Sequence, residues 1–351
     1  MGHMQRNFIL TDVMKTGDHQ MIERFVDQHS LKDQTFEYTG EYYTLHNYEI
    51  DSYDRRFAMI DMRFHNDRLA GNSNYHKDLE SRMALLHQQG FKFILAYPWE
   101  SQENIRTETF MEGRKIPKVQ IPYQHFMWTG GVSWFWFYMY DKHKDRRFTF
   151  DHTNKKYDFL YLNKQPREHR AKLYSKLISK DTLSNSLYTN WPARKLPAAY
   201  ELPWAQDYPS WGKDQDIYEL PYVDTVCSIV SETNDNDYEV FMTEKIWKPI
   251  MAQHVFVVHG NYLYLQKLRE MGFKTFGNYF DESYDLEQDP NKRIDKIVSL
   301  CKDLRTKKWQ DIYLQTKALR QHNYDTFFDK EKLSLEINKT VNLFLEFADS
   351  R

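Results

Sequence analysis

The chain has 351 residues and a formal net charge of −2, so it lacks the strongly basic balance of a dedicated nucleic-acid-binding protein. Its two cysteines, Cys227 and Cys301, are too few for a disulfide framework or a cysteine-rich metal site, which favours a reducing compartment. Neither a signal peptide nor a run of about 18 apolar residues is evident, so we expect a cytoplasmic protein without a membrane span. The length predicts two domains.

We expect residues 5–150 to form a first α/β domain. The apolar segments Phe57–Met62 and Phe91–Ala96 predict two strands, and the amphipathic pattern over Asp78–Gln89 predicts a helix between them that stops at Gly90. A strand–helix–strand order is typical of a parallel sheet.

The end of this domain is marked by composition. The aromatic segment Val132–Tyr140 predicts a buried strand. The charged stretch Asp141–Arg147 follows it and predicts the boundary between the two domains.

We expect residues 151–325 to form a second α/β domain and residues 326–351 to form a C-terminal helix. The elements expected in the second domain are the strand Tyr157–Leu162, the helix Arg167–Ser179, the strand Val226–Val230, the helix Thr243–Ala252 and the strand Val255–Val258. We therefore expect two Rossmann-like domains with ligand sites at the carboxyl ends of their strands, and C-terminal helices that pack across both.

The segment around Glu244 and Lys245 predicts a nucleotide-binding site. These residues open a predicted helix between two predicted strands, preceded by Glu232 and Thr243. The carboxylate of Glu244 suits the two ribose hydroxyls of a nucleotide, and the ammonium of Lys245 suits a phosphate.

A second candidate segment joins the strand Tyr157–Leu162 to the helix after it. Arg167 and Arg170 lie three residues apart, and the strand end directs them to the same sheet edge as Glu244. A planar guanidinium suits bidentate recognition of phosphate. The alternative is a solvated first helical turn in which these residues pair with Glu168.

Three segments together resemble the α1,3-fucosyltransferase family. Ile229–Thr233 resembles the family's strand that runs into Glu-Asn-Ser. Phe241–Lys245 resembles the Tyr-Val/Ile-Thr-Glu-Lys segment that begins the family's next helix, and Val255–Gly260 resembles the strand that closes the unit. Thr233 stands where the family has Asn, and the loop before Phe241 is longer. The resemblance implies a GT-B fold, in which two Rossmann-like domains face an interdomain cleft, and an inverting transfer from a donor such as GDP-fucose or another nucleotide sugar.

The same resemblance extends to the candidate catalytic residues. In the family an arginine after the first strand of the second domain contacts the diphosphate, which implies Arg170 first and Arg167 second. The family's Glu-Ser-Pro, whose glutamate is the general base, resembles Glu100-Ser101 here, with Gln102 at the proline position.

The acceptor side follows from the position of Glu100. An inverting transfer needs one carboxylate to remove the acceptor hydroxyl's proton. Trp99, beside Glu100, suits stacking on a sugar or raising the pKa of the carboxylate by desolvation. Asp61 and His65, after an earlier strand, are alternative bases.

The sequence does not predict a prosthetic group. Asp214-Gln215-Asp216 and Asp235-Asn236-Asp237 have the Asp-x-Asp form that metal-dependent transferases use. Because the basic residues above suit the leaving diphosphate, we expect chemistry that does not require a divalent metal. The expected partners are a nucleotide sugar and a glycan or another hydroxylated acceptor.

Two alternatives remain open. The first is a phage DNA-modifying glycosyltransferase that acts on hydroxymethylated pyrimidine bases in the host cytoplasm, with a local basic track over 141–147, 155–156 and 167–170. The second is a non-catalytic carbohydrate-binding protein that keeps the same fold.

Overall fold

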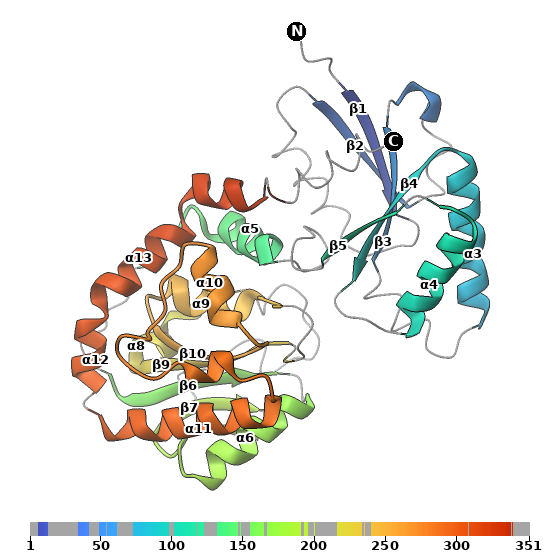
Figure 1. Ribbon diagram of the computed structural model, residues 1–351. Helices are drawn as coiled ribbons and strands as arrows, with labels where there is room; N and C mark the ends of the chain where they lie inside the picture. Colours follow the sequence, from blue (N-terminus) through green and yellow to red (C-terminus); the bar gives the residue numbers. More distant parts are fainter. Residues whose placement is uncertain are drawn as a thin grey trace. The chain divides into compact units, whose positions relative to one another are not determined.

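The computed structural model divides the chain into two compact units (Figure 1). Unit 1 comprises Met1–Trp134 and Ile337–Arg351, and unit 2 comprises Phe135–Glu336. The structure describes residues 6–12, 34–41, 49–53, 55–61, 73–97, 102–116, 118–122, 132–146, 148, 155–164, 167–190, 193–195, 200, 216–233, 235, 240–307, 309–337 and 339.

Unit 1 contains a five-stranded parallel sheet with the strand order β2-β1-β3-β4-β5. The strands are β1 (Arg6–Asp12), β2 (Gln34–Glu41), β3 (Arg55–Asp61), β4 (Lys92–Tyr97) and β5 (Lys118–Pro122). The strand order reverses between β1 and β3, so any ligand crevice of this sheet is expected at the carboxyl ends of these two strands.

Two helices lie side by side on one face of this sheet (Figure 1). They are α3 (Ser73–Gln88) and α4 (Gln102–Gly113), and Arg106 of α4 pairs with Glu80 of α3. The predicted strand–helix–strand order is confirmed, and so is the stop at Gly90, whose φ of 79° is a conformation that glycine favours after a helix. A 3-10 turn covers Ile50–Ser52.

Unit 2 contains a second five-stranded sheet, with the order β10-β9-β6-β7-β8. The strands are β6 (Tyr157–Asn163), β7 (Ser186–Asn190), β8 (Ala193–Lys195), β9 (Thr225–Ser231) and β10 (Val255–His259). All pairs are parallel except β7 with β8. β9 and β10 are buried along their whole length, as expected for a parallel sheet covered on both faces.

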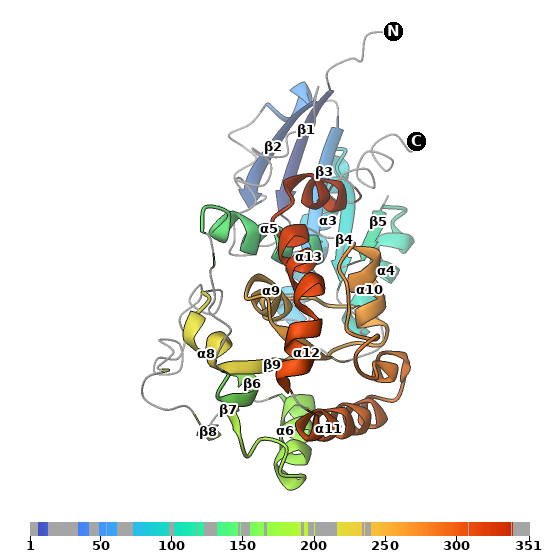
Figure 2. The same ribbon diagram turned by 90° about the vertical axis from the view of Figure 1, so that its left-hand side faces the viewer.

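Helices cover both faces of this sheet (Figures 1 and 2). α6 (Glu168–Ser179) and α11 (Pro290–Thr306) lie side by side on one face, joined by an ion pair between Lys176 and Asp295. α9 (Glu244–Met251) and α13 (Lys317–Phe327) lie on the other. The remaining helical segments are α8 (Glu219–Asp224), α10 (Tyr264–Glu270), the 3-10 turn Ser283–Leu286, α12 (Trp309–Gln315) and residues 330–337.

The segment predicted as a buried strand over Val132–Tyr140 is instead a helix, α5 (Val132–His143), so that prediction is wrong. The ring of Trp136 stacks on Trp247, with centroids 5.7 Å apart, and its indole N–H donates to the carbonyl of Phe327 at 2.9 Å. The strand preference of aromatic residues depends on context, and here an apolar surface of unit 2 favours a helix. The two compact units divide between residues 134 and 135, whereas the predicted boundary follows residue 150.

The fold class is therefore α/β with two sheets that are mainly parallel. The predicted elements of the second domain are confirmed to within a few residues at each end. Packing of the C-terminal helices across both domains stays a prediction. Among the helices that the structure describes, none is long and apolar enough to span a membrane.

Candidate functional site

The candidate site lies at the carboxyl edge of the unit 2 sheet, where β6 and β9 are neighbours. From β6 the chain first builds the sheet outward through β7 and β8, then returns to the other side of β6 as β9 and β10. Ligands of open α/β sheets bind at such a reversal, at the strand carboxyl ends. The chain leaves β6 toward α6, and it leaves β9 toward α9.

Glu232 connects the starts of these two helices. Its backbone carbonyl accepts hydrogen bonds from the guanidinium of Arg170, at 3.1 Å from Nε and 2.9 Å from Nη2, and from Nε2 of His169 at 3.0 Å. Its carboxylate accepts from the backbone N–H and hydroxyl of Thr243 at 3.1 and 2.6 Å, and from the hydroxyl of Tyr264 at 2.7 Å. Glu232 is fully buried. We infer that Glu232 fixes the positions of Arg170, His169 and Thr243 through these hydrogen bonds.

Thr243, Glu244 and Lys245 form the start of α9. Thr243 is the N-cap, with an extended backbone. The ammonium of Lys245 donates to Thr233 Oγ1 at 3.2 Å, to Thr243 Oγ1 at 2.9 Å and to Glu244 Oε1 at 2.7 Å. Because an ammonium has three N–H groups, a phosphate that binds Lys245 must replace one of these partners.

The Glu244 carboxylate is held in its charged form. Burial by itself raises the pKa of Glu244, but the charges of Lys245 and Lys248 outweigh burial, so the pKa lies below its usual range. An ionised carboxylate only accepts hydrogen bonds, which suits a ligand that offers hydroxyl groups.

The two arginines of the predicted phosphate site differ in exposure. Arg170 is 3% exposed, and two of its nitrogens bond Glu232. Its pKa is lowered, first by burial and then by the charge of Arg167, while Glu232 and Glu244 oppose this shift. The charges of Arg167, Glu232 and Glu244 therefore all act on Arg170. Arg167, the N-cap of α6, is exposed and is the better placed of the two for direct contact with a ligand.

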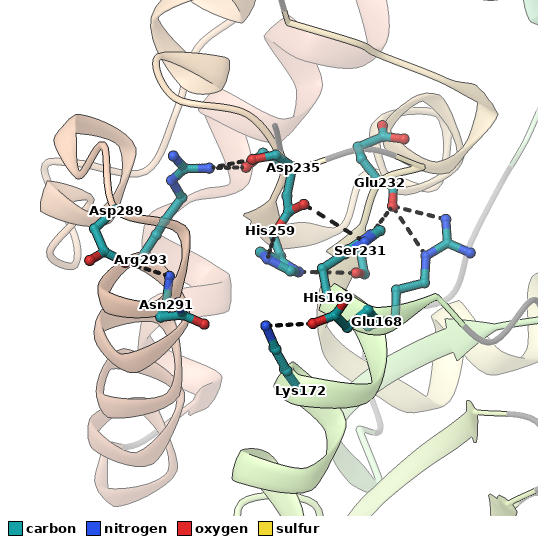
Figure 3. A network of polar contacts seen from close by, with 12 residues as sticks. Glu168, His169, Lys172, Ser231, Glu232, Asp235, His259, Asp289, Asn291 and Arg293 are labelled. Atoms are coloured by element: carbon teal, nitrogen blue, oxygen red, sulfur yellow. Dashed lines mark hydrogen bonds and ion pairs between the residues drawn. The ribbon is translucent and has the colours of Figure 1, made fainter. Parts of the chain in front are cut away.

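A second polar cluster lies beside Glu232 (Figure 3). Asp235 reaches between His259, the last residue of β10, and His169 of α6. Nδ1 of His259 lies 3.2 Å from the hydroxyl of Ser231. Arg293 of α11 donates to the carbonyls of Asp235 at 3.2 Å and of Gly260 at 2.7 Å.

Sequence reasoning missed His169, Tyr264 and Arg293. His169 lies between the two arginines of a segment already singled out, so its position after a strand was an available signal. Tyr264 and Arg293 contact the site from other helices, and no local pattern around them indicates this.

The acceptor-side candidates belong to unit 1. Asp61 is the last residue of β3, which flanks the reversal of strand order in that sheet; its side chain is not described. β4 ends at Tyr97, at the same sheet edge, and the chain continues toward Trp99 and Glu100. His65, Trp99 and Glu100 lie outside the described residues, so their roles stay predictions.

Neither Asp-x-Asp motif is described completely, since Asp214 and Asp237 lie outside the described residues. Asp216 pairs with Lys142, and Asp235 faces the two histidines. Within the described ranges, no three or more His, Cys, Asp or Glu side chains are grouped so that they could hold a metal ion.

No protein-family model matches the sequence, and no curated protein sequence matches it either.

Proposed function

We propose that this protein is a nucleotide-sugar-dependent glycosyltransferase of the GT-B class, in which unit 2 binds the donor and unit 1 the acceptor. One observation carries the proposal: Glu232 joins the starts of α6 and α9 where the strand order of unit 2 reverses. Helix amino termini at such a point suit a diphosphate, and Glu244 and Lys245 add the charges that suit a ribose and a phosphate.

In this proposal each charged group has one role. The carboxylate of Glu244 accepts hydrogen bonds from the ribose hydroxyls. Lys245 exchanges its bond to Glu244 for one to a phosphate oxygen, and Arg167 contacts the diphosphate from α6. Arg170 and Glu232 hold the site in shape, since both are buried and bonded to each other.

The proposed reaction is an inverting transfer. An acceptor hydroxyl attacks the anomeric carbon from the face opposite the nucleotide, and the bond from that carbon to the diphosphate oxygen breaks. The electron pair leaves with the nucleoside diphosphate, and the hydroxyl proton passes to a base. We propose Glu100 as that base, with Asp61 and His65 as alternatives and Trp99 beside the acceptor. The cations of unit 2 balance the departing charge.

Ion pairing favours a glycan over DNA as the acceptor. A DNA-binding track requires cations directed at phosphates. Five cations of residues 141–156 have partners within the protein: Lys142 with Asp216, Lys144 with Asp141, Arg146 with Glu219, Lys156 with Asp224, and Lys155 with the ring of Tyr313. Arg167 is exposed, but we assign it to the nucleotide diphosphate. These contacts give no support to the DNA-modifying alternative.

A nucleotide screen tests the donor site. We expect one of GDP, UDP, ADP and CDP to stabilise the protein by about 2.7 kcal/mol at a hundredfold excess over its Kd. Lys245→Ala should weaken this binding, measured by titration calorimetry. Glu244→Gln should reduce the preference for the ribonucleotide over its 2′-deoxy form. Lys302→Ala, an exposed lysine of α11, is the control that should bind like wild type. Absence of binding by all four nucleotides would reject the proposal.

An activity assay tests the acceptor and the base. The protein is incubated with nucleotide sugars and either oligosaccharides or hydroxymethylated duplex DNA, and the products are identified by mass. We expect transfer to the oligosaccharide, and a loss of about 10²–10⁴-fold in turnover for Glu100→Gln with nucleotide binding retained. Transfer to DNA alone would support the first alternative. Nucleotide or glycan binding without transfer would support the non-catalytic one.

A further inference from the structure

Asp235 occupies a position that the proposed chemistry does not explain. Its Oδ1 lies 3.8 Å from Nδ1 of His169, and its Oδ2 lies 3.6 Å from Nε2 of His259 (Figure 3). Its backbone carbonyl accepts from Arg293. Three elements, α6, β10 and α11, therefore hold one residue of the chain that leaves β9.

The hydrogen positions at this cluster can be assigned from the partners. A carbonyl only accepts, so Nε2 of His169 carries the hydrogen that Glu232 accepts. If the Ser231 hydroxyl donates to Nδ1 of His259, the hydrogen of His259 lies on Nε2 and points at Asp235. At 3.6 Å this N–H is beyond hydrogen-bond distance, and Nε2 has no other hydrogen-bond partner among the described residues.

His169 also connects Asp235 to the nucleotide site. His169 contacts the carbonyl of Glu232 and faces the carboxylate of Asp235. Thr233 lies between those two residues in the sequence, and its hydroxyl accepts from the ammonium of Lys245. Glu232 and Asp235 are thus each bonded through their carbonyl groups, to His169 and to Arg293, and Lys245 bonds Thr233.

We propose that Asp235 is a positioning residue for donor binding: its side chain packs between His169 and His259, its carbonyl is bonded by Arg293, and together these contacts place Thr233 and Glu232 so that they orient Lys245 and Thr243. This inference rests on the proposed function. Asp235 itself does not contact the nucleotide. Its effect passes through Thr233 and Glu232.

Removal of the Asp235 side chain tests this role. In Asp235→Ala the contact of Arg293 with the main chain is kept, so the fold should survive. We expect the Kd of the bound nucleotide to rise roughly tenfold. Without nucleotide, backbone amides of residues 232–235 should exchange hydrogen faster than in wild type, while those of α11 should not change.

Two further variants serve as comparisons. Asp235→Asn keeps a side chain of the same size, with an oxygen that faces Nε2 of His259, so it should restore most of the affinity, and it replaces Asp235→Ala if that variant does not fold. Asp303→Ala removes an exposed carboxylate of α11 and should match wild type in both measurements.

The outcomes separate this inference from the proposed function. If wild type binds no nucleotide, the proposed function fails, and hydrogen exchange still decides whether Asp235 holds the segment. Unchanged affinity in Asp235→Ala, with wild type binding normally, would overturn the inference. Weaker binding without faster exchange would also overturn it, because that result indicates direct contact between Asp235 and the ligand.

Discussion

The carboxylate of Glu232 holds Thr243 at two points, with the backbone N–H at 3.1 Å and the hydroxyl at 2.6 Å. The bond joins the end of β9 to the N-cap of α9 across an intervening loop. The Thr243 hydroxyl in turn accepts from the ammonium of Lys245 at 2.9 Å. Because bonded groups polarise one another, these residues form one connected series in which each member supports the next.

The first prediction concerns Glu232→Gln. The glutamine amide nitrogen does not accept a hydrogen bond, so Thr243 or Tyr264 loses its acceptor. We expect the free energy of unfolding, measured by urea denaturation, to fall by about 2 kcal/mol, since these hydrogen bonds are buried and their acceptor is a carboxylate. Glu270→Gln, at an exposed end of α10, is the control and should change the free energy of unfolding much less. Equal stability of Glu232→Gln and wild type would contradict this account of the site.

The second prediction is a dependence of stability on pH that arises from His169. Burial lowers the pKa of His169 to about 4, against 6.5 for an unperturbed histidine. Between these values the unfolded chain binds a proton that the folded protein does not, so stability is full above pH 6.5 and decreases as the pH falls toward 4. This group should account for a loss of up to about 3 kcal/mol in the free energy of unfolding.

His169→Gln provides the measurement. The glutamine amide still donates to the carbonyl of Glu232 but does not titrate, so the plot of unfolding free energy against pH should be flatter for the variant between pH 6.5 and 4. Parallel plots for variant and wild type would show that His169 does not carry this dependence.

The third prediction concerns Arg293, which is 1% exposed. Its guanidinium donates to the carbonyls of Asp235, Gly260, Glu287 and Gln288. In Arg293→Leu these four acceptors, among them the buried carbonyl of Gly260, lose their donor, and we expect a loss of about 3 kcal/mol in chemical denaturation. Arg305→Leu on the same helix removes a partly exposed pair with Asp158 and should cost at most about 1 kcal/mol. A larger loss for Arg305→Leu than for Arg293→Leu would reverse our ranking.

The fourth prediction concerns the aromatic core where α5, α9 and α13 meet. The ring of Trp136 lies within 6.5 Å, between centroids, of the rings of Trp247, Phe273 and Phe327. Trp136→Ala should reduce the free energy of unfolding by about 3–5 kcal/mol because it leaves a cavity. Trp136→Phe keeps most of the packing but loses the N–H bond to Phe327, so its loss should be smaller. Similar losses in the two variants would show that the hydrogen bond matters more than the packing.

Local patterns were sufficient to predict much of the fold. The strand–helix–strand order around Phe57–Ala96, the strand Val255–Val258 and the helix near Arg167–Ser179 are confirmed. Each depends on periodicity or an end signal within a short window, such as Gly90 after α3. The position of Glu244 and Lys245 at the start of a helix was also predictable, because Thr243 is a favourable N-cap.

Tertiary contacts decided the rest. Val132–Tyr140 is a helix in which the ring of Trp136 packs against Trp247 and Phe327, which are distant in the sequence. Arg170 bonds Glu232 because the strand order places β9 beside β6, and Asp235 lies between His169 and His259 for the same reason. The sequence by itself determined which charged residues stand at the ends of strands and helices. Only the crossing of the chain from β8 back to β9 determined which of them touch. Hydrogen bonds act over about 3 Å, so they depend on which residues are close in space and not on their separation along the chain.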